Sequence, residues 1–156
     1  MGASSAGPAI HLALSEMLGP QESVAVKAWL NLGGILHGSP LIDYYQLKPQ
    51  SWLFDMVARF KGWHKDAIAS MGSHLSRKRF QRLQINANIL IINYIGIPLS
   101  GQLSKYAKHN YSVLRSEGPN DGVTLISDAV APNSITVVAL GSDHYFAEDP
   151  KIGAKT

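Results

Sequence analysis

The sequence predicts one three-layer α/β domain in which helices flank a mostly parallel sheet. Three apolar runs, at 24–32, 89–95 and 135–140, end at glycine or proline and contain too few polar residues for half-exposed strands. Segments with helical spacing separate these runs, and such alternation is typical of layered α/β folds. The chain has 156 residues, of which 46% are apolar, so it can bury a single core.

Composition excludes several classes of chemistry. The chain has no cysteine, which excludes disulfides, thiolate catalysis, iron–sulfur clusters and thiolate zinc sites. No window approaches the ~20 apolar residues of a membrane span, and the first residues lack the layout of a secretory signal. We therefore expect a soluble chain without signal peptide or transmembrane segment, whose compartment the composition leaves open.

The first predicted element is a helix over 9–18. Pro8 suits its first turn, and Gly19-Pro20 ends it. Helical spacing places five residues on one face: Ala6, Ile10, Ala13, Leu14 and Met17.

The later elements follow in the order that a parallel sheet requires. Val24 to Leu32 reads as a buried strand that ends at Gly33-Gly34. Short helices are expected over 44–84, where Trp52, Met56 and Phe60 share a face. Ile89 to Ile95, closed by Gly96 and Pro98, gives the strongest strand signal, and Ile135 to Leu140 predicts a further strand.

Three polar residues lie beside or after these apolar elements. Ser4 precedes the first helix, Asp121 follows the 89–95 strand at a distance, and His144 follows the last strand. The carboxyl ends of parallel strands are where α/β folds place their sites. A serine hydroxyl needs an imidazole to take its proton, and the imidazole needs a carboxylate to fix its tautomer.

The residues around these positions resemble a known family. Gly2-Ala3-Ser4-Ser5-Ala6-Gly7 resembles the Gly-x-Ser-x-Gly nucleophile elbow of the α/β-hydrolase superfamily, with Ala6 at the final glycine. Gly118-Pro119-Asn120-Asp121-Gly122 is similar to the acid loop of its lipase-like and esterase-like members, and Gly141-Ser142-Asp143-His144 to their histidine loop. The resemblance spans essentially the whole chain and corresponds to the carboxyl-terminal half of such an enzyme. We therefore expect an amino-terminally truncated hydrolase domain.

The resemblance implies a role for each residue. Ser4 would be the nucleophile, His144 the base, Asp121 the acid that orients it, and the Ser5 N–H an oxyanion donor. Gly33 and Gly34 would form a tight wall of the substrate cleft. No metal and no organic cofactor is implied.

Alternatives remain at each position. Ser5 is a rival nucleophile if the elbow is shifted by one residue, and Ser4 alone also suits a helix cap. Asp143, Asp128 and Glu117 are rival acids, and His109 is a rival base. Asp128 is the least attractive, since it falls in a predicted helix.

The spacing before Asp121 sets a condition on the acid. About two dozen residues separate Ile95 from Asp121, more than the ~2–6 of a simple connection, so 101–114 must contain a helical excursion. Asp121 by itself is also typical of a turn, and a position in a turn is compatible with a catalytic role.

The segment 44–84 is predicted to be a helical cap or lid inserted between two strands. It is basic: seven of the fourteen lysines and arginines lie between Ala58 and Arg82. We expect peripheral contact with an anionic lipid interface rather than nucleic-acid binding, because no nucleic-acid module accompanies the charge. An ordinary packed helical pair is an equal alternative, and the spacing of His64, Asp66 and His74 fits no metal site.

The resulting hypothesis is a serine hydrolase that cleaves carboxylic esters with an acyl or lipid-like group. The alternative is a non-catalytic remnant that is stable only in association, for example as a homo-oligomer through an exposed sheet edge.

Overall fold

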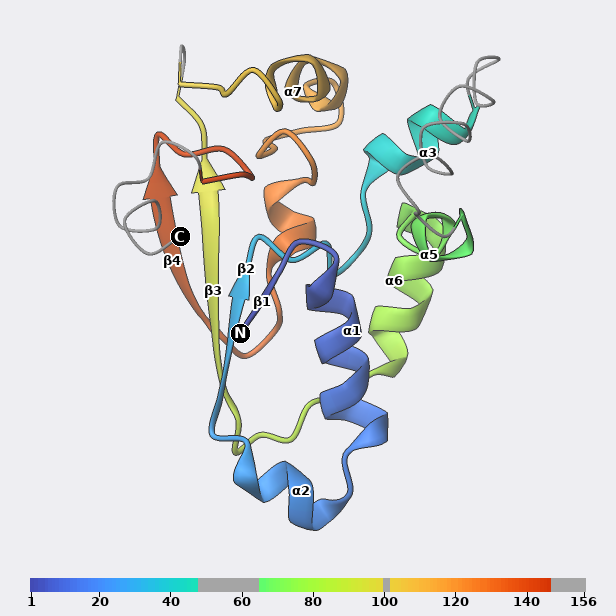
Figure 1. Ribbon diagram of the computed structural model, residues 1–156, viewed down its shortest axis with the longest axis vertical. Coiled ribbons are helices and arrows are strands. Elements are labelled where there is room, and N and C mark those ends of the chain that lie inside the picture. The colour runs from blue at the N-terminus through green and yellow to red at the C-terminus, as the bar shows by residue number, and fades with distance from the viewer. Residues whose placement is uncertain (48–64, 100–101, 147–156) are drawn as a thin grey trace.

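The computed structural model describes residues 1–47, 65–99 and 102–146 and contains a four-stranded parallel sheet. The strands are β1 (Gly2–Ala3), β2 (Ala28–Leu32), β3 (Leu90–Ile97) and β4 (Ile135–Leu140), side by side in sequence order (Figure 1). This confirms the predicted α/β architecture with a parallel sheet.

Two of the predicted strands differ in length from expectation. The run from Val24 is not all strand, because a short helix, α2 (Pro20–Ala25), takes its first residues and β2 begins only at Ala28. Periodicity cannot separate a buried helix end from a buried strand in so short a run. The strand predicted to close at Gly96 continues through it to Ile97, whereas β4 has the predicted bounds.

The register aligns the carboxyl ends of the strands. Leu32 of β2 pairs with Tyr94 of β3, and Tyr94 pairs with Val137 of β4. Because all strands run the same way, the segments that follow β1, β2, β3 and β4 emerge at one edge of the sheet.

The first helix starts earlier than predicted and changes type. It comprises α1 (Ala6–Leu12) and a π-helical turn, η1 (Ala13–Met17), with Pro8 in the first turn as expected. The face predicted from spacing is right in part: Leu14 is buried and Ile10 packs against the core, whereas Ala6 is exposed and Met17 is 70% exposed. The other buried residues of this helix are Gly7, Pro8 and His11. The spacing of apolar residues could not reveal this face, because the polar ring of His11 lies within it.

Four further helices are described. They are α3 (Pro40–Leu47), α5 (Lys65–Ala69), α6 (Ser73–Arg82) and α7 (Lys108–Leu114), and a 3₁₀ turn, η2 (Ile126–Ala129), precedes β4. The helical excursion between Ile95 and Asp121 is therefore present as α7, and Asp128 lies in a helical turn as predicted.

The predicted cap lies partly outside the described residues, including Trp52, Met56, Phe60, Trp63 and His64. Within its described part, α6 runs beside α1 (Figure 1) and buries Phe80 in the core with Trp29 and Leu14. Its Arg77 is bonded to Asp128, 3.2 Å away. A lid role for this segment stays a prediction.

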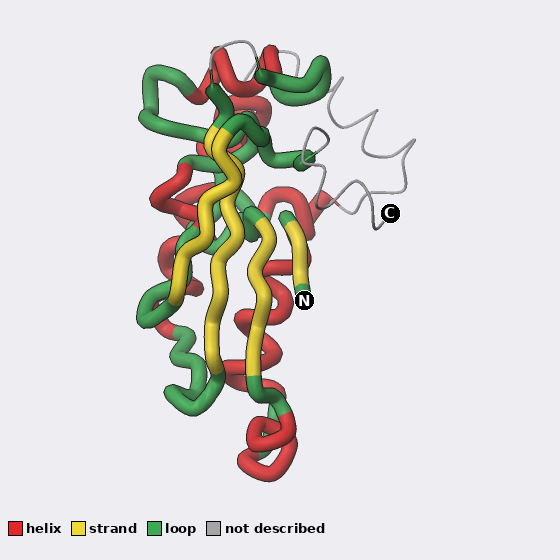
Figure 2. The backbone as a smooth tube through the Cα atoms, turned by 90° about the vertical axis from the view of Figure 1, so that its left-hand side faces the viewer, coloured by secondary structure: helices red, strands yellow, loops and turns green. Residues whose placement is uncertain are grey.

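The described helices cover one face of the sheet. Figure 2 shows the strands in front of them. Strand alternation and register place Leu90, Ile135 and Val137 on the face opposite to Ile91, and these side chains are 47%, 56% and 42% exposed. The covered face holds the core, which includes Trp29, Ile91 and Leu36.

A buried amide pair crosses the covered face. Asn31 of β2 donates to the side-chain oxygen of Asn93 of β3 at 3.0 Å and to the carbonyl of Ala129 at 3.0 Å. Asn93 in turn donates to Ser134 at 2.6 Å and accepts from the Ala131 N–H at 3.2 Å. These bonds fix the segment between η2 and β4 against the sheet.

Candidate active site

Ser4 lies in the tight turn between β1 and α1. Its φ of 50° is a left-handed conformation that non-glycine residues rarely adopt, as expected for a strained elbow. The backbone on both sides is pinned: the Ser4 N–H donates to the Leu32 carbonyl at 3.0 Å, and the Gly7 N–H donates to the Ser4 carbonyl at 3.1 Å. The serine side chain is thereby lifted above the carboxyl edge of the sheet.

The turn needs a small residue at Gly7. A Cβ there would lie 2.9 Å from the Cα of Gly34 and 3.1 Å from the Asn31 amide oxygen. The start of α1 and the loop after β2 can approach this closely because neither glycine has a side chain.

His144 lies on the loop after β4 and faces Ser4. Its Nε2 is 2.9 Å from the Ser4 Oγ, and its Nδ1 is 2.7 Å from the Asp121 Oδ2. The His144 backbone N–H also donates to the Asp121 carbonyl at 2.8 Å. The two loops are thus joined through both backbone and side chain.

Asp121 is held by its own loop. Its Oδ1 accepts the N–H groups of Val123 at 2.9 Å and Thr124 at 2.8 Å, which leaves Oδ2 for the imidazole. Asp121 is 1% exposed and His144 is 7% exposed, so the pair is shielded from water and its mutual attraction is weakly screened.

The acid loop is tied to the segment after β2. The Thr124 hydroxyl donates to the Gly38 carbonyl at 3.0 Å, and the Ser39 hydroxyl donates to the Val123 carbonyl. Both side chains are fully buried. Sequence reasoning did not select Ser39 or Thr124, because their role depends on contacts between residues more than eighty positions apart.

Gly33 and Gly34 have distinct positions. Gly33 has a φ of +52°, and a Cβ there would lie 3.5 Å from the His144 Nδ1 and 3.7 Å from the Asp121 Oδ2. Gly33 therefore packs on the imidazole–carboxylate pair, whereas Gly34 packs on Asn31 and Gly7 beneath the elbow. Their role as a wall of the substrate cleft stays a prediction.

Ser5 is the residue before α1 and is exposed. Its side chain makes no capping hydrogen bond, and the hydroxyl that contacts His144 belongs to Ser4. Among the described residues, no carbonyl accepts the Ser5 N–H, so this donor is free to meet a ligand.

The rival residues have other partners or surroundings. Asp143 accepts the N–H groups of Ser104 at 2.7 Å and Tyr145 at 3.0 Å, and Asp128 pairs with Arg77. Glu117 and His109 are exposed.

Two further residues shape the site without a clear signal in the sequence. Gly96 faces the histidine loop so closely that a Cβ would lie 2.6 Å from the Ser142 carbonyl oxygen. Tyr145, beside His144, is 46% exposed. Burial of its ring, followed by the negative charges of Asp143 and Asp121, raises its pKa above the usual value.

Two absences concern the described residues alone. No three His, Asp or Glu side chains among them gather closely enough to hold a metal ion. None of their helices has the length and apolar content that crossing a bilayer requires.

The fold is similar to those of solved lipase and esterase structures. The mature form of the lipase BlEst2 from Bacillus licheniformis superposes with a TM-score of 0.71 at 22% identity, over 92% of this chain and 56% of that one. The metagenomic carboxyl esterase MGS0156 superposes with a TM-score of 0.73 at 18% identity, over 91% of this chain and 43% of that one. The propeptide form of BlEst2 gives a TM-score of 0.74 at 20% identity, over 92% and 31% respectively.

These likenesses confirm an α/β-hydrolase fold over the part that the chain spans. The chain covers 31 to 56% of the length of these three structures, so it corresponds to part of such a domain. No protein-family model matches the sequence, and no curated protein matches it.

Proposed function

We propose that this chain supplies the nucleophile, base and acid of a serine hydrolase that cleaves carboxylic esters. The observation that carries the proposal is the continuous hydrogen-bonded chain from the Ser4 Oγ through both nitrogens of His144 to Asp121, with distances of 2.9 and 2.7 Å. The fold of solved lipase and esterase structures supports the choice of an ester as substrate.

The first half of the reaction follows from the hydrogen-bond directions. The Ser4 Oγ attacks the ester carbonyl as His144 Nε2 takes the hydroxyl proton. The Nδ1–H of His144 donates to the Asp121 carboxylate throughout, which fixes the tautomer and stabilises the imidazolium. His144 then gives its proton to the leaving alcohol, and an acyl group remains on Ser4.

Water completes the cycle by the same path. His144 removes a proton from water, the resulting hydroxide attacks the acyl carbon, and the proton returns to the Ser4 oxygen as the acid leaves. The Ser5 N–H, at the amino end of α1, donates to the oxyanion in both tetrahedral intermediates. An acyl or lipid-like group on the substrate is part of the proposal.

Ser4→Ala tests the assignment, with Ser5→Ala as the matched control. Hydrolysis of a p-nitrophenyl ester should fall by roughly 10⁴-fold or more in kcat for Ser4→Ala, because no other group replaces the nucleophile. Ser5→Ala removes the rival hydroxyl but keeps the backbone donor, so we expect a change of less than about threefold. Equal activity of Ser4→Ala and the parent chain refutes the proposal.

The partly exposed apolar face of the sheet favours a second candidate, a non-catalytic domain that requires association. Leu90, Ile135 and Val137 are each more than 40% exposed, and burial of such a patch against a second chain would stabilise both. Light scattering combined with the ester assay separates the candidates: a monomer that turns over ester refutes the second.

A further inference from the structure

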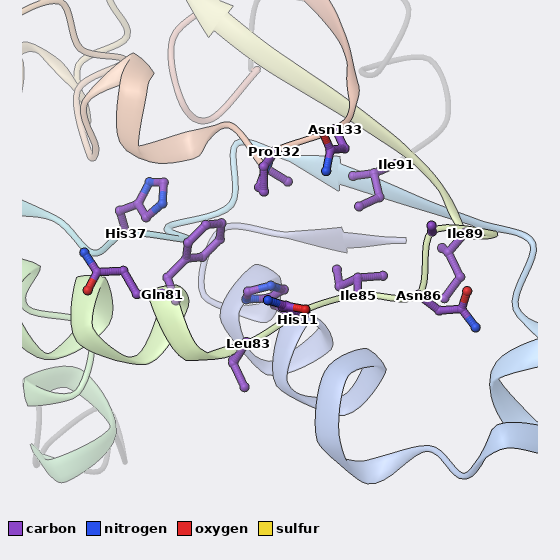
Figure 3. Close-up of a pocket in the computed structure, with 14 residues that line it drawn as sticks. His11, His37, Gln81, Leu83, Ile85, Asn86, Ile89, Ile91, Pro132 and Asn133 are labelled. Atoms are coloured by element: carbon purple, nitrogen blue, oxygen red, sulfur yellow. The ribbon is translucent and has the colours of Figure 1, made fainter.

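A cavity of about 740 Å³ lies on the helix-covered face, toward the amino ends of the strands. Ser4 and His144 lie at the carboxyl edge. Figure 3 shows His11 of α1, Ile85 of the segment after α6, Ile91 of β3 and Pro132 from before β4 arranged around the hollow. Its volume falls within the range typical of small-molecule sites.

The walls of the cavity combine apolar side chains with histidine and amide side chains and carry no formal charge. The aliphatic side chains in the lining are those of Leu83, Ile85, Ile89 and Ile91, and Phe80 is its aromatic residue besides the histidines. Among the described residues, no aspartate, glutamate, lysine or arginine lines the cavity. A ligand that carries a full charge would therefore lose hydration without gaining an opposite charge.

One buried polar side chain, that of His11, faces the cavity. His11 is 4% exposed, and its ring lies 4.5 Å from the ring of Phe80 and 6.1 Å from that of Trp29. Among the described residues, the hydrogen bond of His11 is at its backbone carbonyl, which accepts the Ser15 hydroxyl at 2.7 Å, and none is formed by a ring nitrogen. The His11 ring nitrogens are not among the fully enclosed polar atoms that lack a partner, so they keep contact with the open space of the cavity.

The protonation state of His11 defines what a partner of its ring can be. Burial, followed by the positive surroundings of His37 and Arg79, lowers its pKa from 6.5 to about 4. Near neutral pH the imidazole is uncharged and offers one N–H donor and one acceptor. Amide side chains at Gln84 and Asn133 add further donors and acceptors to the lining.

We propose that this cavity binds a small uncharged molecule that combines an apolar ring or chain with a hydrogen-bonding group placed against His11. The apolar part covers the isoleucine and leucine side chains, and the polar part satisfies the imidazole. Binding uses no atom of Ser4, His144 or Asp121, so this site stands or falls independently of ester hydrolysis.

Benzamide is a suitable probe, because it is planar, neutral and carries both a donor and an acceptor. The probe is titrated into the full chain while the methyl signals of Ile89 and Ile91 and the ring signals of His11 are followed by NMR. We expect saturable shifts at these residues with a dissociation constant in the millimolar range, as is usual for a fragment of this size. Benzoate should bind at least about tenfold more weakly, because its charge has no partner in the cavity.

Two pairs of variants assign the site. Ala87→Trp places a large ring on an exposed lining residue and should abolish the shifts, whereas Ala25→Trp, at an exposed residue outside the lining, should leave them unchanged. His11→Phe keeps a ring of similar size but removes its nitrogens. This variant should weaken benzamide binding roughly three- to tenfold, because one hydrogen bond is lost. Its affinity for toluene should stay within about twofold of that of the parent chain.

Several results would overturn the proposal. One is the absence of saturable NMR shifts up to the solubility limit of benzamide, and another is a set of shifts confined to the loops of Ser4 and His144. Tighter binding of benzoate than of benzamide, or undiminished benzamide binding by Ala87→Trp, would overturn it as well. Retention of the benzamide shifts in Ser4→Ala supports a site separate from the catalytic one.

Discussion

Two buried histidines, His144 and His11, occupy very different surroundings in the same fold. His144 is hydrogen-bonded through both ring nitrogens, to Ser4 and Asp121, whereas the ring of His11 lies beside those of Trp29 and Phe80 and lines a cavity. Their exposures, 7% and 4%, are almost equal. Burial alone thus favours the uncharged imidazole. A buried imidazole can serve as a general base only when both of its nitrogens have the right hydrogen-bond partners.

The largest expected effect tests the partner of His144. Asp121→Asn keeps the shape of the side chain but cannot hold the imidazole in the tautomer that accepts a proton from Ser4. We expect kcat for ester hydrolysis to fall by about 10⁴-fold with an unchanged thermal midpoint. Asp143→Asn is the control at the rival acid, and a larger loss there than in Asp121→Asn would contradict the assignment.

The next effect tests the support of the histidine loop. Gly96→Ala places a Cβ within 2.6 Å of the Ser142 carbonyl oxygen and 2.8 Å of that of Asp143, and neither backbone group can rotate away. The loop must shift, and a displacement near 1 Å can cost about 10²-fold in kcat. The unfolding free energy should also drop by about 1–3 kcal/mol.

The control for that variant is Gly19→Ala. Its new Cβ would meet only Glu22 Oε2 at an ordinary 3.5 Å, and its φ is not positive. Activity should stay within about twofold of the parent. If both variants behave alike, the close approach at Gly96 does not position His144.

A smaller effect is expected from acid, and it concerns His11. Burial, aided by His37 and Arg79, lowers the folded-state pKa of His11 from 6.5 to about 4, so between these values the unfolded chain binds more protons. The free energy of unfolding is therefore fully retained above pH 6.5 and falls as the pH drops toward 4. By pH 5 the loss from His11 is about 2 kcal/mol. The pKa of His37 is also lowered, mainly by burial, and shifts stability in the same direction.

Urea unfolding at pH 7 and pH 5 measures this dependence. His11→Phe should lose most of it, while His74→Gln, at an exposed histidine on α6, should keep it. A parent chain whose stability does not change between these pH values would show that His11 is not held neutral.

The smallest effect returns to the carboxyl edge. Gly33→Ala adds a methyl at ordinary contact distance from His144 and Asp121, so its main cost is the positive φ of +52°, about 1–2 kcal/mol. We expect a destabilised chain with less than about tenfold loss of kcat. Gly118→Ala, whose φ is +143° and whose Cβ would meet nothing within 4 Å, should lose stability but no activity.

The sequence predicted three of the four strands and the three polar positions, because both are encoded locally; β1 (Gly2–Ala3) was not predicted. Ile135 to Leu140 is β-branched and bounded by turn residues, and Ser4, Asp121 and His144 each lie on a loop that follows or leads from an apolar element. The catalytic roles of these three residues stay predictions until Ser4→Ala and Asp121→Asn are measured.

Other features depend on partners remote in the chain. The run from Val24 was expected to be all strand. The apolar residues of the first helix, including Ala6 and Met17, were expected to share one face. Each held in part: β2 covers only Ala28–Leu32, because α2 occupies Val24 and Ala25. Leu14 is buried as expected but Ala6 and Met17 are exposed, because α1 turns His11 toward Trp29 and Phe80.

What the sequence by itself determined is the α/β class, the parallel strands and the candidate residues, since apolar runs and turn residues act over a few positions. Only the tertiary structure decided that Ser4 rather than Ser5 contacts Nε2 of His144, and that Asp121 rather than Asp143 contacts Nδ1. It also showed that the loop of His144 approaches Gly96 closely because that residue has no side chain. These outcomes rest on contacts of 2.7 and 2.9 Å between segments up to 140 residues apart, and no local pattern carries that information.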